Sequence, residues 1–459
     1  MNFDSNDKNK NNLYANEKQK ILSGGKIYGK GAKGAAYDAA CILDDKETFC
    51  YEISKKIDGK KIENIIIKLF SSTTGITKVF KSEDIFNKFL NDLKGNDEII
   101  LKKFINEKTK ERDFNNEIAA IQDLFFIYRM DVEKYTALTE INLLDDFKYI
   151  GFSAQIGSER NFYVVNKKCG DTFDKISSLL LLNQYHTRFS EELNLMISNI
   201  LDSLLILYNN KMYHCDIKPN NIICDETEGA KVKYKLIDWE KAKKLKDLKD
   251  MYNSKSLSNP YGGVAYTSPL CVLLHKQTTN VHEARFELFK LAVCKEIAIW
   301  PWDNDYKRYS TILEERVCKP CKSLFQESSF DMLSTYISSF DLFALGISIL
   351  ICVIRNKNYT DAYLPFIDTL INYTNINYSY NPKIAIRNWE RLNKSIVIKP
   401  DGSGGAHKNS KIDNNYLYLR SNMNKLFKVQ NEGTRKFIIL KKSKMYLSDI
   451  RGQYRFLRS

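Results

Sequence analysis

An α+β fold, with strands and helices segregated along the chain, is predicted by three features of the sequence. From Ile27 to Ile67, apolar stretches alternate with Gly- and Asp-rich breaks, a pattern typical of hairpin-connected strands. Helical periodicity follows in Asn115–Arg129 and, more strongly, in Glu191–Asn209, and helices are expected to dominate after that. Beyond a Gly- and Ser-rich linker at 396–415, residues 416–459 return to short β-like runs, which predicts a small basic β-rich module.

The N-terminus and the most apolar run bear on how the chain would meet a membrane. Residues 1–20 are polar and charged, without the apolar core of a signal peptide or an amphipathic transit pattern, so we expect a disordered N-terminus. The most apolar run, Phe343–Ile354, is shorter than the roughly 20 residues that span a bilayer. We therefore expect a buried helix there and no membrane span.

Charge and cysteine usage indicate partners and compartment. Lys and Arg total 70 against 56 Asp and Glu, a formal charge of +14, and the last 59 residues hold 13 basic and 4 acidic side chains. Such a tail suits an acidic protein partner, nucleic acid or an anionic membrane, although a solvated surface is the commoner explanation. Ten scattered cysteines indicate free thiols in a reducing compartment, so we expect a cytoplasmic protein, or a virion component if the chain is viral.

A glycine triplet is the first candidate for ligand chemistry. Gly29, Gly31 and Gly34 form a G-x-G-x-x-G turn, whose backbone amides can approach phosphate oxygens closely because no side chain intervenes. Such triplets also arise by chance and in dinucleotide-binding folds, where the turn leads into a helix. Here the turn leads into an apolar strand-like run that includes Ala36, which favours a flap over a nucleotide.

A lysine and a glutamate form a second candidate pair. Lys68 ends the apolar run IIIKLF, which places a cation on a strand, and Glu117 sits on an amphipathic helical segment. We expect Glu117 to pair with Lys68 and to hold it against phosphates. Taken singly, Lys68 has the alternative explanation of a strand-end lysine that points to solvent, and Glu117 is better explained as a solvated helix residue.

The most specific segment is Tyr213–Ile223, YHCDIKPNNII, directly after the long predicted helix. His214, Asp216, Lys218 and Asn221 have the spacing of a phosphoryl-transfer catalytic loop, and the strand-like LIDWE with its carboxylate Asp238 follows. The competing explanation is a capped loop in which Asp216 and Asn221 make only local hydrogen bonds.

These motifs, in this order and at these separations, resemble the eukaryotic-type protein kinase superfamily over residues 21–395. The resemblance implies a bilobal fold, with a small β-rich N-terminal lobe, a larger helical C-terminal lobe, and ATP in the cleft between them. It implies that Asp216 accepts the proton of the attacking hydroxyl and that Lys218 neutralises charge at the γ-phosphate. Asn221 and Asp238 would hold the magnesium ions. The implied ATP-binding residues are Gly29, Gly31, Gly34, Ala36, Lys68, Glu117 and Val164.

Three further segments resemble parts of the same family. Tyr163–Phe173 resembles the fifth strand and hinge, with Val164 or a near neighbour lining the adenine pocket. Gly263–Leu270 resembles the end of the activation segment. Asp341, in the apolar run described above, is implied to cap the backbone of the catalytic loop.

The chain also departs from the family at specific positions. Cys215 stands where many kinases carry the Arg that reads a phosphorylated activation loop. Trp239 and Glu240 replace the usual Phe and Gly, which removes backbone freedom after the metal ligand. Leu270 replaces a Glu that normally pairs with a distant Arg.

Spacing departs from the family as well. The separation of Lys68 from Glu117 predicts an insertion near 71–110, and a second insertion is expected near 272–330. The second one holds a C-x-x-C at Cys318 and Cys321, for which free thiols are favoured over a zinc site.

The function predicted is a serine/threonine protein kinase that uses ATP and Mg²⁺ and acts on a protein substrate. Lys218, two residues after Asp216, resembles the Ser/Thr group. Two alternatives stay open: a small-molecule kinase of the aminoglycoside or choline kinase type, suggested by LIDWE, and a pseudokinase scaffold. The Asn, Lys and Ile bias suits a large DNA virus or a protist as the source.

Overall fold

The chain divides into two compact units in the computed structural model. The first comprises Met1–Gly170 with Asp225–Ala242, and the second comprises Asp171–Cys224 with Lys243–Ser459. The residues that the structure describes are 27–30, 33–38, 65–80, 89, 93, 98–143, 147–182, 185–225, 232–253, 264–266, 290–294, 306–319, 339–354, 357–371, 381–394, 396, 427–432, 435–440 and 457–458. The predicted disordered N-terminus and nearly all of the predicted linker lie outside these residues.

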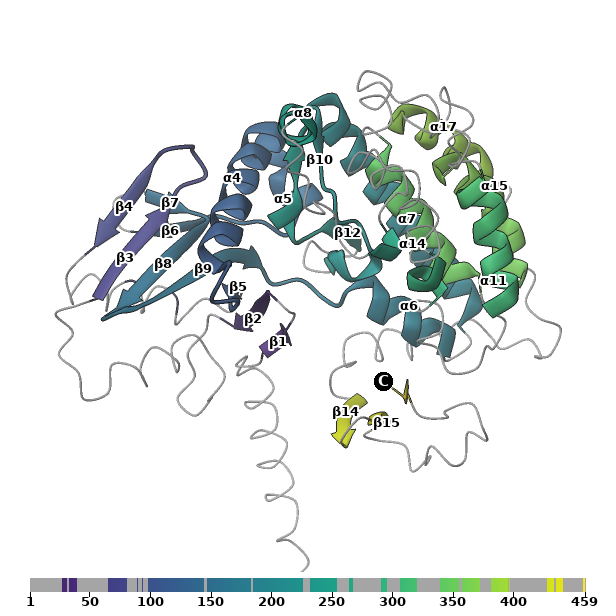
Figure 1. The fold of residues 1–459 in the computed structure, drawn as a ribbon, viewed down its shortest axis with the longest axis horizontal. Helices are drawn as coiled ribbons and strands as arrows, with labels where there is room; N and C mark the ends of the chain where they lie inside the picture. Colours follow the sequence, from purple (N-terminus) through teal and green to yellow (C-terminus); the bar gives the residue numbers. More distant parts are fainter. Residues whose placement is uncertain are drawn as a thin grey trace, which may run out of the picture. The chain divides into compact units, whose positions relative to one another are not determined.

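A seven-stranded sheet forms the core of the first unit (Figure 1). Its strands, in spatial order, are β1 (Ile27–Lys30), β2 (Gly34–Asp38), β5 (Ile99–Phe104), β9 (Glu159–Lys167), β8 (Gly151–Ile156), β3 (Ile65–Phe70) and β4 (Thr77–Phe80). All neighbours pair antiparallel. The β-rich N-terminal region that the sequence predicts is therefore confirmed.

The hairpin of β3 and β4 extends this sheet at the edge opposite β1. It pairs through β3 with β8, and β4 forms the outer strand. Ile76 and Val79 in this hairpin are 48% and 47% exposed, so the edge of the sheet is partly apolar. The chain between β2 and β5 thus adds two strands at a site remote from both of them.

Helix α4 (Lys110–Tyr128) packs on the sheet through aromatic rings. The ring of Phe114 makes an edge contact with Phe104 at 5.8 Å between centroids and a tilted contact with Phe162 at 5.1 Å. Close packing also requires glycine at 151, because a Cβ there would lie 2.7 Å from an isoleucine side chain of α4. The helix is thereby held at a defined position over β5, β8 and β9.

The first unit also contains several short elements. They are η2 (Arg129–Asp131), α5 (Val132–Tyr135), β6 (Ile141–Leu143), β7 (Phe147–Tyr149), β12 (Lys233–Leu236) and η4 (Trp239–Lys241).

Helices dominate the second unit, as the sequence predicts (Figure 1). They are α6 (Phe173–Leu182), α7 (His186–Asn209), α8 (Leu245–Asn253), α11 (Tyr306–Leu313), the π-helical turn η6 (Glu314–Cys318), α14 (Phe340–Val353), α15 (Lys357–Ile371) and α17 (Pro382–Asn393). Shorter elements are β10 (Met212–Tyr213), η3 (Pro219–Asn221), β11 (Ile222–Asp225, reaching the unit boundary), β13 (Lys243–Lys244) and η5 (Val264–Tyr266).

Helix α14 is the central element of this unit. All 14 of its residues are buried, which confirms the buried helix expected from its apolar sequence. It approaches α15 so closely that a Cβ on Gly346 would lie 2.6 Å from the Ile371 side chain. Helices α7 and α17 are joined by a hydrogen bond from Trp389 Nε1 to Ser198 Oγ at 2.8 Å. The helical unit therefore provides a rigid base for the loop that follows α7.

The C-terminal part of the chain contains the predicted short strands. β14 (Phe427–Glu432), β15 (Arg435–Leu440) and β16 (Leu457–Arg458) form a three-stranded antiparallel sheet. Among the helices in the described part of the chain, each is too short or too polar to cross a bilayer.

Candidate active site

One lysine and two carboxylates form a closely spaced charge cluster in the first unit. Lys102 Nζ, on β5, lies 2.6 Å from Glu117 Oε2 on α4 and 2.6 Å from Asp238 Oδ1 just after β12. The Glu117 side chain is only 2% exposed, whereas that of Asp238 is 36% exposed. Glu117 is therefore a buried support, and Asp238 is the carboxylate of the cluster that solvent or a ligand can reach.

The surroundings of this cluster shift its titration. Burial raises the pKa of Glu117 to about 7, although the charge of Lys102 opposes the shift. Burial also disfavours the charged form of Lys102, but the carboxylates of Asp238 and Glu117 outweigh it, so the pKa of this lysine is raised. Lys102 therefore keeps a full positive charge on a site lined by acidic groups.

The prediction that Lys68 pairs with Glu117 is wrong. Lys68 lies on β3, with its ammonium 5.0 Å from the centroid of the Phe70 ring. In the strand order β3 is three positions from β5, which is about 14 Å at the usual spacing between neighbouring strands. Lys102 takes the expected place instead, 15 residues before Glu117. The long separation that suggested an insertion between lysine and glutamate disappears, because the extra chain lies between β2 and β5.

The glycine-rich turn lies next to this lysine. Gly29 is in β1 and Gly34 opens β2, whereas Gly31 lies outside the described residues. A Cβ on Gly34 would lie 3.1 Å from the carbonyl oxygen of Lys103, so glycine permits a close approach of the turn to β5. The absence of side chains is therefore used for backbone packing here.

The sheet register groups three more of the site residues. Ala36 on β2 and Val164 on β9 both lie directly opposite Lys102. Since residues directly opposite in antiparallel strands share a face, these three side chains form one row across β2, β5 and β9. Val164 is fully buried. Its contact with an adenine base stays a prediction.

The turn after β12 shows how the chain manages without glycine at position 240. The positive φ falls on Asp238, with φ 69° and ψ 70°, a left-handed conformation that Asp tolerates better than most residues. Trp239 and Glu240 follow in the short helix η4, and both are buried. The conformational freedom that a glycine would give at position 240 is thus not needed there.

The second unit holds the loop that the sequence singled out. Asp216 Oδ2 accepts hydrogen bonds from Lys218 Nζ at 3.0 Å and from Asn221 Nδ2 at 3.1 Å. Asn221 Nδ2 also donates to the Asp216 carbonyl at 2.9 Å. Asp216 Oδ1 has no hydrogen-bond partner among the described residues. One oxygen of this carboxylate is thus fixed by the protein and the other is left available as an acceptor.

Asp341 supports this loop from α14, as the resemblance implies. Its carboxylate accepts hydrogen bonds from the backbone N–H groups of His214 at 2.7 Å and Cys215 at 2.9 Å. Burial raises the pKa of Asp341, while His214 and the two backbone donors oppose the shift. Cys215 has a φ of 61°, so its peptide group adopts a turn that a side chain rarely favours. The buried carboxylate stabilises this turn by satisfying both amides.

Several predicted features lie wholly or partly outside the described residues. They include most of the activation segment and Leu270, as well as Cys321. Cys294 and Cys318 are described, and both are buried and outside any disulfide.

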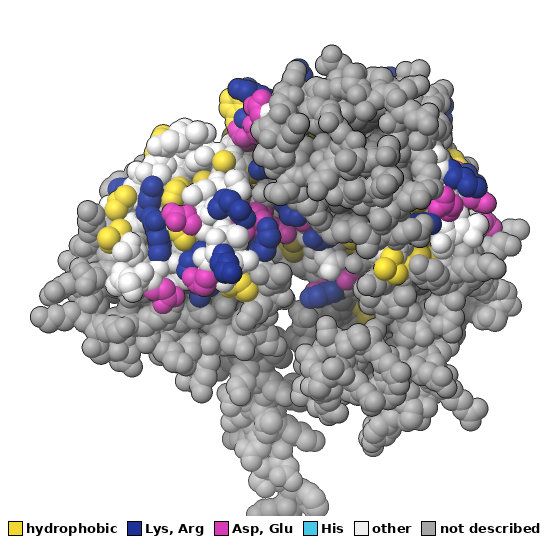
Figure 2. Space-filling view, viewed as in Figure 1, with side chains coloured by type: hydrophobic (Ala, Val, Ile, Leu, Met, Phe, Trp, Pro, Cys, Tyr) yellow, Lys and Arg dark blue, Asp and Glu magenta, His cyan; other side chains and the backbone are white. Residues whose placement is uncertain are grey.

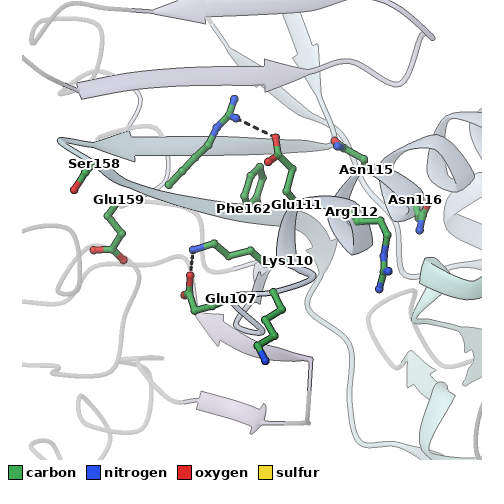
Figure 3. Close-up of a pocket in the computed structure, with 11 residues that line it drawn as sticks. Glu107, Lys110, Glu111, Arg112, Asn115, Asn116, Ser158, Glu159 and Phe162 are labelled. Atoms are coloured by element: carbon green, nitrogen blue, oxygen red, sulfur yellow. Dashed lines mark hydrogen bonds and ion pairs between the residues drawn. The ribbon is translucent and has the colours of Figure 1, made fainter.

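A separate pocket of about 910 Å³ lies at the first turns of α4 (Figure 3). Two ion pairs cross its surroundings, Lys110 with Glu107 at 2.6 Å and Arg160 with Glu111 at 3.0 Å. Its lining is polar and charged apart from Phe162, and it contains none of the predicted site residues. Figure 2 shows one face of the first unit at the left, where basic and acidic side chains are also mixed.

Comparison with known proteins points to the same family as the sequence motifs. Residues 93–294 match the family model of the protein kinase domain, a range that includes the Lys102 cluster and the Asp216 loop. This part of the chain is therefore recognised as a protein kinase domain. The matched range includes both Lys102 and Glu117, and it begins after Lys68.

Relatives of this kinase domain include curated serine/threonine kinases. The MAP kinase-interacting serine/threonine-protein kinase 2 of Xenopus laevis is 27% identical over 140 residues, covering 29% of this chain and 28% of the relative. A probable serine/threonine-protein kinase of Dictyostelium discoideum is 32% identical over 184 residues, covering 39% and 31%. The chain thus spans about a third or less of the length of these relatives. A rhoptry kinase from Toxoplasma gondii has a similar solved structure, with a TM-score of 0.36, 10% identity, and coverage of 72% of this chain and 83% of that one.

Lys102 is the member of this charge cluster that sequence reasoning missed, although a signal for it existed. The segment IILK ends in Lys102 just as IIIK ends in Lys68, so the two strands match the same local pattern. The short distance from Lys102 to Glu117 along the chain is the feature that distinguishes them.

Proposed function

We propose that this chain is a serine/threonine protein kinase, which transfers the γ-phosphate of ATP to hydroxyl groups of a protein substrate. The observation that carries the proposal is the hydrogen-bonded loop of Asp216, Lys218 and Asn221, with one Asp216 oxygen left as an acceptor. A loop built only for local structure gains nothing from an unpartnered carboxylate oxygen next to a lysine, because an unsatisfied acceptor destabilises the fold.

The residues present fit ATP with Mg²⁺ as the cofactor. When bound, Mg²⁺ neutralises phosphate charge and orients the transferring group. Hard oxygen donors suit this ion, and the chain offers the half-exposed carboxylate of Asp238 and the side-chain amide of Asn221 as its ligands. Lys102, held charged by Glu117, provides a cation for the α- and β-phosphates, in the role first expected of Lys68. Ala36 and Val164, which share a face of the sheet with Lys102, are the residues proposed to lie beside the base.

Asp216 and Lys218 have the roles nearest to the transfer itself. The free Oδ1 of Asp216 is positioned as the acceptor for the proton of the attacking hydroxyl, while Asn221 holds Oδ2 and fixes the orientation of the carboxylate. Lys218 lies 3.0 Å from the same carboxylate and supplies positive charge where negative charge develops. The D-x-K spacing supports Ser and Thr as acceptors over small molecules.

The test is a phosphorylation assay with purified protein, labelled ATP, Mg²⁺ and generic acceptor proteins, followed by identification of the labelled amino acid. We expect phosphoserine or phosphothreonine. Asp216→Asn should lower the rate by about 10² to 10⁴-fold while ATP still binds, because a general base contributes that much. Label on a small molecule would favour the aminoglycoside or choline kinase alternative, and ATP binding without any turnover would favour the scaffold.

The basic C-terminal strands remain a separate hypothesis. With 13 basic and 4 acidic side chains in the last 59 residues, docking of an acidic protein or of nucleic acid is proposed for this segment. Binding of that kind weakens steeply with salt, so titration of an anionic ligand at two salt concentrations tests it.

A further inference from the structure

A second lysine of the first unit is held between two carboxylates, and it belongs to the glycine-rich turn. Lys33 Nζ donates a hydrogen bond to Glu240 Oε1 and lies 3.7 Å from Asp113 Oδ2. We name Lys33, Asp113 and Glu240 the flap clasp. None of its members belongs to the Lys102 cluster.

The flap clasp repeats the arrangement of the Lys102 cluster on the same two elements. Asp113 lies four residues before Glu117 on α4, so the two carboxylates share a face of that helix. Glu240 lies two residues after Asp238. The helix and the turn therefore each contribute one carboxylate to Lys102 and a second one to Lys33, and each lysine joins the same two elements.

Burial makes the charge of Lys33 necessary. The side chains of Asp113 and Glu240 are 3% and 9% exposed, whereas that of Lys33 is 43% exposed. Two nearly buried carboxylates side by side are unfavourable without a cation, because each loses its hydration. Arg112 reaches only the Oδ1 atom of Asp113, at 3.2 Å. Lys33 is thus the cation that the described residues offer to both acids.

The backbone of Lys33 is anchored as well. Its carbonyl accepts a hydrogen bond from Ile105 N at 2.9 Å, just after β5, and Gly34 packs against β5 directly. The base of the glycine-rich turn is therefore attached to the strand that carries Lys102, while the Lys33 ammonium reaches α4 and η4. A turn held at both points has fewer open conformations than one held at its base alone.

We propose that Lys33 is a positioning residue that holds the glycine-rich turn closed through Glu240 and Asp113. This inference rests on the proposed ATP site, over which the turn would act as a flap. Lys33 acts through the backbone of the turn and not by contact with phosphate. The flap clasp couples the position of the flap to the helix that carries Glu117 and to the turn that carries Asp238.

Hydrogen exchange of the nucleotide-free protein tests the flap clasp without any need for activity. In Lys33→Met, amides in residues 27–38 should exchange about fivefold faster or more, because local opening costs less free energy once the ion pair is lost. Glu240→Gln should accelerate the same amides, and Lys33→Arg should restore near-normal exchange. Lys108→Met, at an exposed lysine outside the cluster, is the matched control and should leave these amides unchanged. Unchanged exchange in Lys33→Met, or an equal acceleration in Lys33→Arg, would overturn the proposal.

Kinetics then separate a flap clasp from a phosphate ligand. A flap clasp predicts that Lys33→Met and Glu240→Gln both raise the KM for ATP about tenfold with less than about a twofold change in kcat, as expected when binding that is equal in ground and transition states is lost. If Lys33 bound phosphate itself, Glu240→Gln would release it and leave the KM unchanged or lower, which would refute the flap clasp. Failure of the wild-type protein to bind ATP would reject the proposed function, while the exchange experiment would still decide on the flap clasp.

Discussion

Replacing Lys102 by Met should abolish most of the proposed phosphoryl transfer, whereas replacing Lys68 by Met should not. The two lysines end closely similar apolar segments and lie in the same sheet. Only Lys102 contacts Glu117 and Asp238, each at 2.6 Å. The pair of variants therefore compares the same chemical change at two strand positions, one inside the charge cluster and one outside it.

The size of the effect follows from the burial of Glu117. Truncating one member of a buried, hydrogen-bonded charge pair typically costs about 2–5 kcal/mol, which corresponds to about 30-fold to 5,000-fold in kcat/KM. Glu117 is 2% exposed and its pKa is already raised to about 7, so it can take up a proton when Lys102 is lost and relieve part of this penalty. We therefore expect a loss of about 10²-fold in kcat/KM for Lys102→Met, near the lower end of that range. Lys68→Met should stay within about twofold, because Lys68 lies outside the charge cluster and is only partly buried.

The assay is steady-state phosphorylation of a generic protein acceptor at varied ATP concentration. Thermal unfolding of both variants controls for loss of the fold. Activity retained in a folded Lys102→Met protein, together with its loss in Lys68→Met, would refute the assignment and reinstate the lysine of β3.

Three further predictions concern the buried carboxylates of Glu117 and Asp341. The kcat/KM for ATP should rise as pH increases through about 7, because only ionised Glu117 pairs with Lys102, and Glu117→Gln should lack this limb. Folding raises the pKa of Glu117 from its ordinary value of 4.5 to about 7, so the contribution of Glu117 to the free energy of unfolding should fall as the pH rises across this range. Denaturant titrations at several pH values will show this. Asp341→Ala should lower the free energy of unfolding by about 2–4 kcal/mol, since two buried amides lose their acceptor. Asp361→Ala, an exposed aspartate on α15, should change it by less than about 0.5 kcal/mol.

Local sequence patterns predicted the elements whose signal is contained within one segment. The helix at 191–209 and the buried run from Phe343 were both found, because periodicity and uniform apolarity are local properties. The loop of Asp216, Lys218 and Asn221 could be singled out for the same reason, since these residues lie within six positions of one another, and its catalytic role stays a prediction. Asp341 was also placed correctly beneath this loop, by the resemblance and not by any local pattern.

The choice between Lys68 and Lys102 could not be made in that way. It depends on which strand lies beside the glycine-rich hairpin, and the order β1-β2-β5-β9-β8-β3-β4 is set by pairing between distant segments. The flap clasp was still harder to predict from the sequence, because Lys33 and Glu240 are 207 residues apart and neither matches a motif in its own segment. Contacts of this range depend on the folded sheet and helix, so they are outside the reach of spacing arguments.

The left-handed backbone at Asp238 has a consequence for where conformational entropy is lost. A glycine after Asp238 would leave this turn with many accessible conformations in the folded chain, and binding of the proposed nucleotide would have to restrict them. Here Trp239 is 1% exposed and Glu240 is held by Lys33, so the turn is restricted when the chain folds. The entropic cost is thereby moved from the binding step to the folding step. The carboxylate of Asp238 is already ordered before a ligand binds.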